Sequence, residues 1–247
     1  RLPIEGGGLL NIALNQGSSI ESLSAERDAG GAIRVRMNED NAAGLASLTL
    51  PSGLLEGVRL EIDMVAETGS LFTYKEFSSN ALHEKDKLVR DAAGTTLTTL
   101  VSDPETGQAV AVPLVVEPDS GAVYMPLQYP VHVALLDEAG RPISTVGEPI
   151  TLCFKFTLLT TGDSSGANVR VVHNQGQPDQ EVLTPVSISL LADGVTAHTC
   201  VRTTSFSYFT VVAQIPGSLP TTGFSESMKS CAWTWLFSAR SEDRTER

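Results

Sequence analysis

Residues 58–64, which read VRLEIDM, decide the fold. Valine, leucine, isoleucine and methionine alternate there with arginine, glutamate and aspartate. The same alternation recurs in residues 33–37 (IRVRM), 131–135 (VHVAL) and 152–158 (LCFKFTL). A period of two places the apolar side chains on one face of a strand and the polar side chains on the other. This pattern is typical of antiparallel sheets that pack face to face.

Further strands are predicted where apolar and β-branched residues cluster between turn sequences. They are residues 9–14, 45–50, 95–101, 109–116, 169–173, 182–191, 195–201 and 206–213, and the turns are residues 51–53, 103–107, 117–121, 137–140 and 192–194. Strands at intervals of roughly 10–15 residues suit a β-sandwich. The sequence therefore predicts an all-β protein of one or two antiparallel β-sandwiches.

Helical signals are sparse and occur in two segments. Residues 18–28 open with a capping-box pattern from Ser18 to Glu21, and residues 79–92 contain Leu82, His83, Leu88 and Val89 with mixed charges between them. For both segments, irregular connections between strands are favoured over short surface helices.

Composition divides the chain into three parts. A first β unit spans residues 1–93 and a second β-sandwich spans residues 94–213; a single sandwich with long loops is the alternative. Residues 214–247 read as a Pro/Gly linker followed by an aromatic tail that holds both tryptophans of the chain. The apolar residues of the tail are Cys231, Trp233, Trp235, Leu236 and Phe237. Because tryptophan is enriched at interfaces, the tail either docks on a partner or folds back on the sandwich.

The balance of charged and apolar residues excludes several classes of protein. The chain has 247 residues, of which 29 are acidic and 17 basic, a net charge of −12, and 41% are hydrophobic. The apolar content is enough to bury a core, which excludes wholesale disorder. The net acidity argues against binding nucleic acid or an anionic membrane surface. No run of about 18 apolar residues occurs, so we expect no membrane insertion by this chain.

Residues 194–212, GVTAHTCVRTTSFSYFTVV, form the segment with the most specific pattern. This segment resembles the last strands of GAIN-like domains, which lie near the membrane in adhesion receptors, polycystin-related proteins and surface proteins of algae and protists. Residues 48–55 and 150–156 resemble further strands of such extracellular sandwich modules. The resemblance covers mainly the C-terminal half. It implies an Ig-like or GAIN-like sandwich at the cell surface or outside the cell.

By this resemblance, Ser205, Phe206 and Ser207 occupy the tripeptide at which that family cleaves itself. Ser207 stands in the place of the nucleophile, and Ser205 replaces the histidine that serves as the base. A hydroxyl without a base is a poor nucleophile. The resemblance therefore implies a degenerate site that does not cleave, and a relic that still cleaves before Ser207 is the alternative.

The chain has three cysteines, Cys153, Cys200 and Cys231. The first two fall out of phase with the apolar residues of their strands, so they either bridge neighbouring strands or remain free thiols in a cytosolic protein. In the modules that the chain resembles, a cysteine pair joins the equivalent strands. The resemblance thus implies a Cys153–Cys200 disulfide and an oxidising compartment. Cys231 is left over, either as a free thiol or for a bridge to another chain.

No catalytic motif stands out. The histidines at positions 83, 132, 173 and 198 are dispersed, and no zinc, nucleotide or serine-nucleophile motif occurs. His132 and His198 fall on the polar face of their strands, which favours ordinary solvated residues. The sequence therefore predicts neither an enzyme nor a bound cofactor.

Two acidic loops are weak candidates for calcium, because carboxylate and amide oxygens are the ligands that calcium prefers. Their candidate ligands are Asn38 and Asp40 in one loop and Asp103 and Glu105 in the other. Solvated turns are the favoured interpretation of both. Aromatic residues make up only 6% of the chain, which argues against stacking platforms for sugars.

These observations favour a non-enzymatic structural or adhesion module of a larger extracellular or cell-surface assembly. Its partners would be protein subunits, contacted through exposed strand edges and the tail. A glycan- or calcium-binding sandwich is the first alternative. An intracellular scaffold subunit with reduced thiols, for instance in a cilium, is the second. The chain begins with arginine rather than methionine, which indicates a processed or excerpted piece of a longer protein.

Overall fold

The computed structural model describes residues 1–14, 23–37, 44–52, 58–64, 88–102, 109–117, 120–157, 168–175, 179–192 and 196–215. These residues form strands, turns and irregular segments without a helix, which confirms the predicted all-β class. The strands are β1 (Leu2–Glu5), β2 (Leu9–Leu14), β3 (Leu23–Arg27), β4 (Ile33–Met37), β5 (Leu45–Leu50), β6 (Arg59–Met64), β7 (Thr98–Ser102), β8 (Ala109–Pro113), β9 (Val115–Glu117), β10 (Ala122–Pro126), β11 (Val131–Leu136), β12 (Pro142–Ile143), β13 (Thr145–Thr157), β14 (Val169–His173), β15 (Glu181–Leu183), β16 (Ser187–Leu190), β17 (Thr196–Ser205) and β18 (Tyr208–Gln214).

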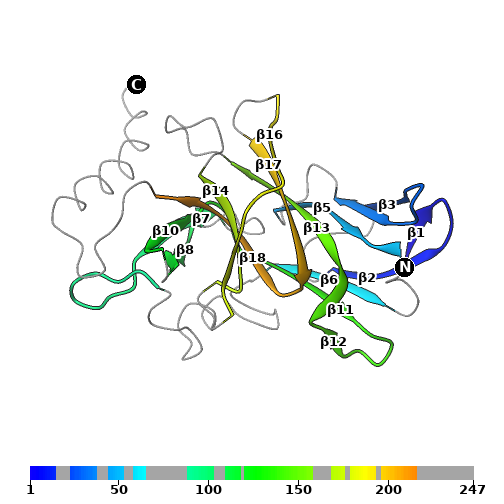
Figure 1. Ribbon diagram of the computed structural model, residues 1–247, viewed down its shortest axis with the longest axis horizontal. Helices are drawn as coiled ribbons and strands as arrows, with labels where there is room; N and C mark the ends of the chain where they lie inside the picture. The colour runs from blue at the N-terminus through cyan, green and yellow to red at the C-terminus, as the bar shows by residue number, and fades with distance from the viewer. Residues whose placement is uncertain are drawn as a thin grey trace, which may run out of the picture.

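One large sheet contains all of these strands except β7 and β8, which form a sheet of their own (Figure 1). Its order is β15-β14-β18-β11-β6-β2-β1-β3-β4-β5-β13-β17-β16; beside this path, β10 pairs with β18, β9 pairs with β10, and β12 pairs with β11. The sheet has two arms, which meet at β1. Leu2 and Pro3 of this strand pair with β2, and the next two residues pair with β3. We call β1-β3-β4-β5-β13-β17-β16 the β5 arm and β15-β14-β18-β11-β6-β2 the β18 arm.

The sheet is mixed rather than purely antiparallel. Most pairs are antiparallel, as predicted, but β1 with β3 and β2 with β6 are parallel. The β2–β6 pair is parallel because the chain leaves the β18 arm after β2, builds β3, β4 and β5 in the other arm, and then returns. Parallel neighbours require such a long crossover connection.

The two arms share a single hydrophobic core. Buried residues of the β5 arm, such as Leu48 and Leu152, belong to the same cluster as Leu60 of the β18 arm. The rings of Phe154 and Phe209, one from each arm, lie 6.0 Å apart between centroids. Opposed arms with one core between them are the arrangement of a β-sandwich.

A second layer covers the outer face of the β18 arm. Val101 of β7 and Val112 of β8 pack with Tyr208, and the segment around Leu88 and Val115 packs on β14 and β18. All residues from Tyr208 to Val212 are consequently buried. This cover explains why β18 reads as a nearly continuous apolar run rather than an alternation.

The predicted units of residues 1–93 and 94–213 are interleaved in the described residues. Strand β5 pairs with β13, and β6 pairs with β11, so strands of both segments lie side by side. The division of the chain into these units stays a prediction. Of the third segment, 214–247, only Gln214 and Ile215 are described, and Gln214 ends β18.

Several predicted strands match the observed bounds, and others were missed. The predictions at 9–14, 45–50 and 169–173 coincide with β2, β5 and β14. Strand β3 lies inside the segment 18–28 that carried the capping-box pattern, and β1 and β10 were not predicted. The helical pattern fails at β3 because Leu23 and Ala25 are buried in register against β4, and such tertiary pairing outweighs local propensity.

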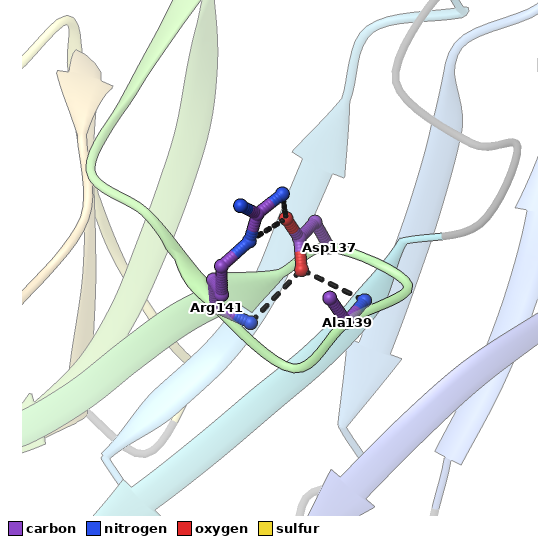
Figure 2. A network of polar contacts seen from close by, with 3 residues as sticks. All are labelled: Asp137, Ala139 and Arg141. Carbon is purple, nitrogen blue, oxygen red and sulfur yellow. Dashed lines mark hydrogen bonds and ion pairs between the residues drawn. The ribbon is translucent and has the colours of Figure 1, made fainter.

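Three tight turns share one construction, which Figure 2 shows for Asp137. The Asp137 Oδ1 atom accepts hydrogen bonds from the backbone N–H groups of Ala139 and Arg141, each at 2.9 Å. Gly140 has a φ of 75° and donates its N–H to the Asp137 carbonyl. The turns that begin at Asp28 and Asp91 repeat this pattern, with a positive-φ glycine three residues later.

Candidate functional site

A disulfide joins Cys153 of β13 to Cys200 of β17 in the β5 arm. The two residues stand directly opposite each other in the antiparallel pair, with 4.0 Å between their Cα atoms. This pairing agrees with the one that the resemblance implied. The bond spans 47 residues of sequence, for which chain entropy gives about 4 kcal/mol of stabilisation. Disulfides persist in oxidising compartments, so the bond indicates a non-reducing environment.

Strand β16 forms the free edge of this disulfide-bonded arm. Its partner is β17, and no other described strand pairs with it. All four of its residues are exposed. Residues 182–192 contain no charged side chain, so the edge lacks the charges that commonly protect exposed strand edges. An exposed, uncharged edge is a template for pairing with another strand.

Apolar side chains line one face of this edge. Val186, Ile188 and Leu190, which we call the edge stripe, are 58%, 37% and 49% exposed. Their alternate spacing places them on the same face. Ile188 and Leu190 stand opposite the buried residues Thr199 and Ala197 of β17. The edge stripe therefore continues the core face of the β5 arm, but it is open to solvent.

The tripeptide Ser205-Phe206-Ser207 forms the turn between β17 and β18. Phe206 is buried in the core, and the Ser205 N–H donates a 3.1 Å hydrogen bond to Thr203 Oγ1. The Ser207 carbonyl accepts a hydrogen bond from the Val133 N–H. Among the described residues, no hydrogen bond joins the Ser207 hydroxyl to a histidine. The absence of self-cleavage stays a prediction.

His173, at the end of β14, is a buried histidine rather than a surface residue. Its ring stacks on Phe209 with 4.7 Å between centroids. Burial lowers the pKa of His173 to about 4, although the nearby Asp179 carboxylate acts in the opposite direction. The adjacent Asn174 donates a 2.6 Å hydrogen bond to Asp179, and Gln175 donates one to the last carbonyl of β8. These contacts tie β14 to the outer layer and indicate a structural role.

His132 was predicted to be an ordinary solvated residue, but the structure partly buries it. Its ring lies 4.6 Å from the ring of Tyr208, on the face that β7 and β8 cover. Burial lowers the pKa of His132, and the Glu61 carboxylate opposes this shift. The sequence could not predict this cover, because β7 and β8 come to lie on this face only in the folded chain.

The other predicted site residues lie outside the described residues. They are the calcium candidates Asn38, Asp40, Asp103 and Glu105, and the tail residues Cys231, Trp233, Trp235, Leu236 and Phe237. Within the described ranges, no group of three or more histidine, cysteine, aspartate or glutamate residues is placed to hold a metal ion. No helix in that part of the chain is long and apolar enough to cross a membrane.

Comparisons of the chain with protein-family models, with curated proteins and with solved structures find no match. The structural feature that points to a function is the free edge at β16, which is uncharged and exposes apolar side chains. Sequence reasoning predicted contacts through strand edges and one strand at residues 182–191, but the structure divides that segment between β15 and β16, which form the two ends of the large sheet. The signal that points to this edge is the uncharged run of residues 182–192.

Proposed function

We propose that the chain is a non-enzymatic structural or adhesion module of an extracellular or cell-surface assembly. In this proposal, neighbouring copies join through the edge of β16. The observation that carries it is the edge stripe, Val186, Ile188 and Leu190, on an uncharged strand whose outer edge pairs with no other described strand. The disulfide supports an extracellular setting over an intracellular scaffold, since the cytosol keeps thiols reduced.

A second copy of the chain fits this edge in both geometry and charge. Two β16 strands that pair antiparallel around a two-fold axis bring their edge stripes together on one face. Each copy carries a net charge of −12, so most approaches between copies meet repulsion. The edge of β16 avoids this repulsion because residues 182–192 are uncharged.

The contact is small, which suits an assembly rather than an isolated dimer. A four-residue edge buries much less than the roughly 1,600 Å² of a standard interface. Pairwise binding should therefore be weak. Repetition along an assembly or a cell surface raises the overall strength, because linked contacts act at a high effective concentration.

Sedimentation equilibrium at physiological ionic strength tests this proposal. We expect the native chain to dimerise reversibly as its concentration rises. Ile188→Lys places a charge on the edge and removes apolar contact from both copies, so it should weaken dimerisation on the order of tenfold or more.

Leu9→Lys is the matched control. Leu9 is 59% exposed, but its backbone pairs with Pro3 inside the large sheet, so this variant should dimerise like the native chain. A native chain that stays monomeric at every concentration contradicts the proposal. Equal weakening by Ile188→Lys and Leu9→Lys contradicts it as well.

A further inference from the structure

The outer face of the β5 arm, opposite the core, is polar throughout its described part. Its side chains alternate with the core residues of β4, β5, β13 and β17. The face carries hydroxyl groups, the disulfide and several basic residues, and none of the exposed large hydrophobic residues of the described chain lies on it. Phenylalanine, tyrosine and tryptophan are also missing from these four strands on this side.

Two arginines and two threonines form one row across this face. Arg34 stands opposite Thr49, Thr49 opposite Thr151, and Thr151 opposite Arg202. Residues that are paired in register project from the same face of a sheet. With about 4.8 Å between strands, the two arginines are about 14 Å apart at their backbones, with the two hydroxyls between them.

The arginines of this row are available to a ligand. Arg34 and Arg202 are exposed, and neither forms an ion pair or a side-chain hydrogen bond with another described residue. Arg36, two residues along β4, is held by Glu26 at 2.5 Å, which leaves that carboxylate engaged. The two unpaired arginines of this row give the face positive charge, although the whole chain has a net charge of −12. Such a concentration of positive charge attracts anions.

We infer that the arginine row, Arg34-Thr49-Thr151-Arg202, binds an extended acidic polysaccharide that lies across the strands. Each guanidinium group matches the planar or tetrahedral oxygens of a carboxylate or sulfate group with paired N–H donors. The threonine hydroxyls both donate and accept, which suits sugar hydroxyl groups between the acidic groups. This surface differs from the edge of β16, so the inference goes beyond the proposed function and the two can fail separately.

The same face is a poor match for an acidic protein or a single-stranded nucleic acid. Protein interfaces centre on buried apolar and aromatic residues, which this face lacks. Single-stranded nucleic acids bind through bases stacked on aromatic rings, and the four strands offer none on this side. The face offers only positive charge and hydroxyl groups to a ligand. Acidic polysaccharides are the class of polymer that these groups can recognise without apolar or aromatic contacts.

Binding to dextran sulfate and to uncharged dextran, measured by calorimetry at physiological ionic strength, tests the inference. The two probes share a backbone and differ only in sulfate groups. We expect binding to dextran sulfate alone, with affinity that falls as salt is added. Arg34→Gln and Arg202→Gln should each lower the affinity on the order of tenfold, because each removes a charged hydrogen-bonding group.

Arg141→Gln is the matched control, since it makes the same charge change at an exposed arginine on the β11–β12 turn. This variant should bind dextran sulfate like the native chain, and thermal unfolding should show all three variants folded. Binding to polygalacturonate tests whether carboxylate groups can replace sulfate groups. The inference is supported if dextran sulfate or polygalacturonate binds and both arginine substitutions weaken that binding. It is overturned if neither polymer binds, or if Arg141→Gln weakens binding as much. Equal binding of polyglutamate through both arginines also overturns it, because the face would then recognise acidic protein.

Discussion

At the scale of single residues, His173 links burial to stability. Its ring is 4% exposed and stacks on Phe209, so the folded chain holds it uncharged at neutral pH. The unfolded chain exposes the ring to water, where its pKa returns to about 6.5. Asp179 is the charged group that opposes the shift, and it is not enough to cancel the effect of burial.

The lowered pKa of His173 predicts a loss of stability in mild acid. Because the folded pKa of about 4 lies below the unfolded value, the unfolded chain binds more protons between these two pH values. Stability is fully present above pH 6.5 and falls as the pH drops toward 4. By pH 4.5 the loss should be roughly 2 to 3 kcal/mol from this residue. Urea unfolding at pH 7 and pH 4.5 measures it.

His173→Phe supplies the comparison, because it keeps a ring against Phe209 but cannot titrate. Its stability should change less between pH 7 and pH 4.5 than that of the native chain. Some dependence should remain, since burial also lowers the pKa of His132. An unchanged pH dependence in His173→Phe would show that this histidine is not the group that titrates.

At the scale of elements, the three aspartate turns show how local chemistry sets a hairpin. In each, the carboxylate of Asp28, Asp91 or Asp137 accepts two backbone N–H groups, and a glycine three residues later adopts a positive φ. Aspartate favours this arrangement because its short side chain reaches the backbone two residues on. Glycine is needed because an L side chain is strained at positive φ.

Gly140→Ala should therefore destabilise the β11–β12 turn. Gly140 has a φ of 75°, and a Cβ atom there meets nothing within 4 Å, so the cost comes from the backbone alone. We expect a loss of about 1 kcal/mol in the free energy of unfolding. Gly147→Ala is the control, since its Cβ also meets nothing and its φ is not positive. Equal effects of the two substitutions would refute the strain argument.

Strands were predictable from the sequence where one face is exposed to solvent and the other face is buried. In β4, the exposed Arg34 and Arg36 alternate with the buried Ile33, Val35 and Met37, which produces the period of two that was recognised. Strand β10 shows no such signal, because the outer layer and its neighbour β18 bury residues on both of its sides. Burial by distant segments leaves no periodic mark in the strand itself.

At the scale of the whole molecule, the single core predicts a single unfolding transition. Leu48 lies in the first half of the sequence and belongs to the same core cluster as residues of the second half, including Phe154 and Phe209. Leu48→Ala should lower the free energy of unfolding by about 2–5 kcal/mol. The loss should be the same for the slowest-exchanging amides of β4 and of β14, measured by native-state hydrogen exchange.

Leu100→Ala serves as the control, because Leu100 is 63% exposed on β7 and contributes little to any core. Its effect on exchange should be small in both arms. Two separate transitions, or a Leu48→Ala effect confined to β4, would instead show that residues 1–93 and 94–213 fold as independent units.

The sequence by itself determined the all-β class, the bounds of strands such as β2 and β5, and which face of each amphipathic strand is buried. These features follow from a side-chain period of two, which is a local property of the chain. Tertiary structure alone decided that β5 pairs with β13, that the outer layer partly buries His132 beside Tyr208, that His173 is buried against Phe209 of the core, and that β16 is left as a free edge. The physical reason is that a strand's pattern records which face is buried, but not which strand lies beside it.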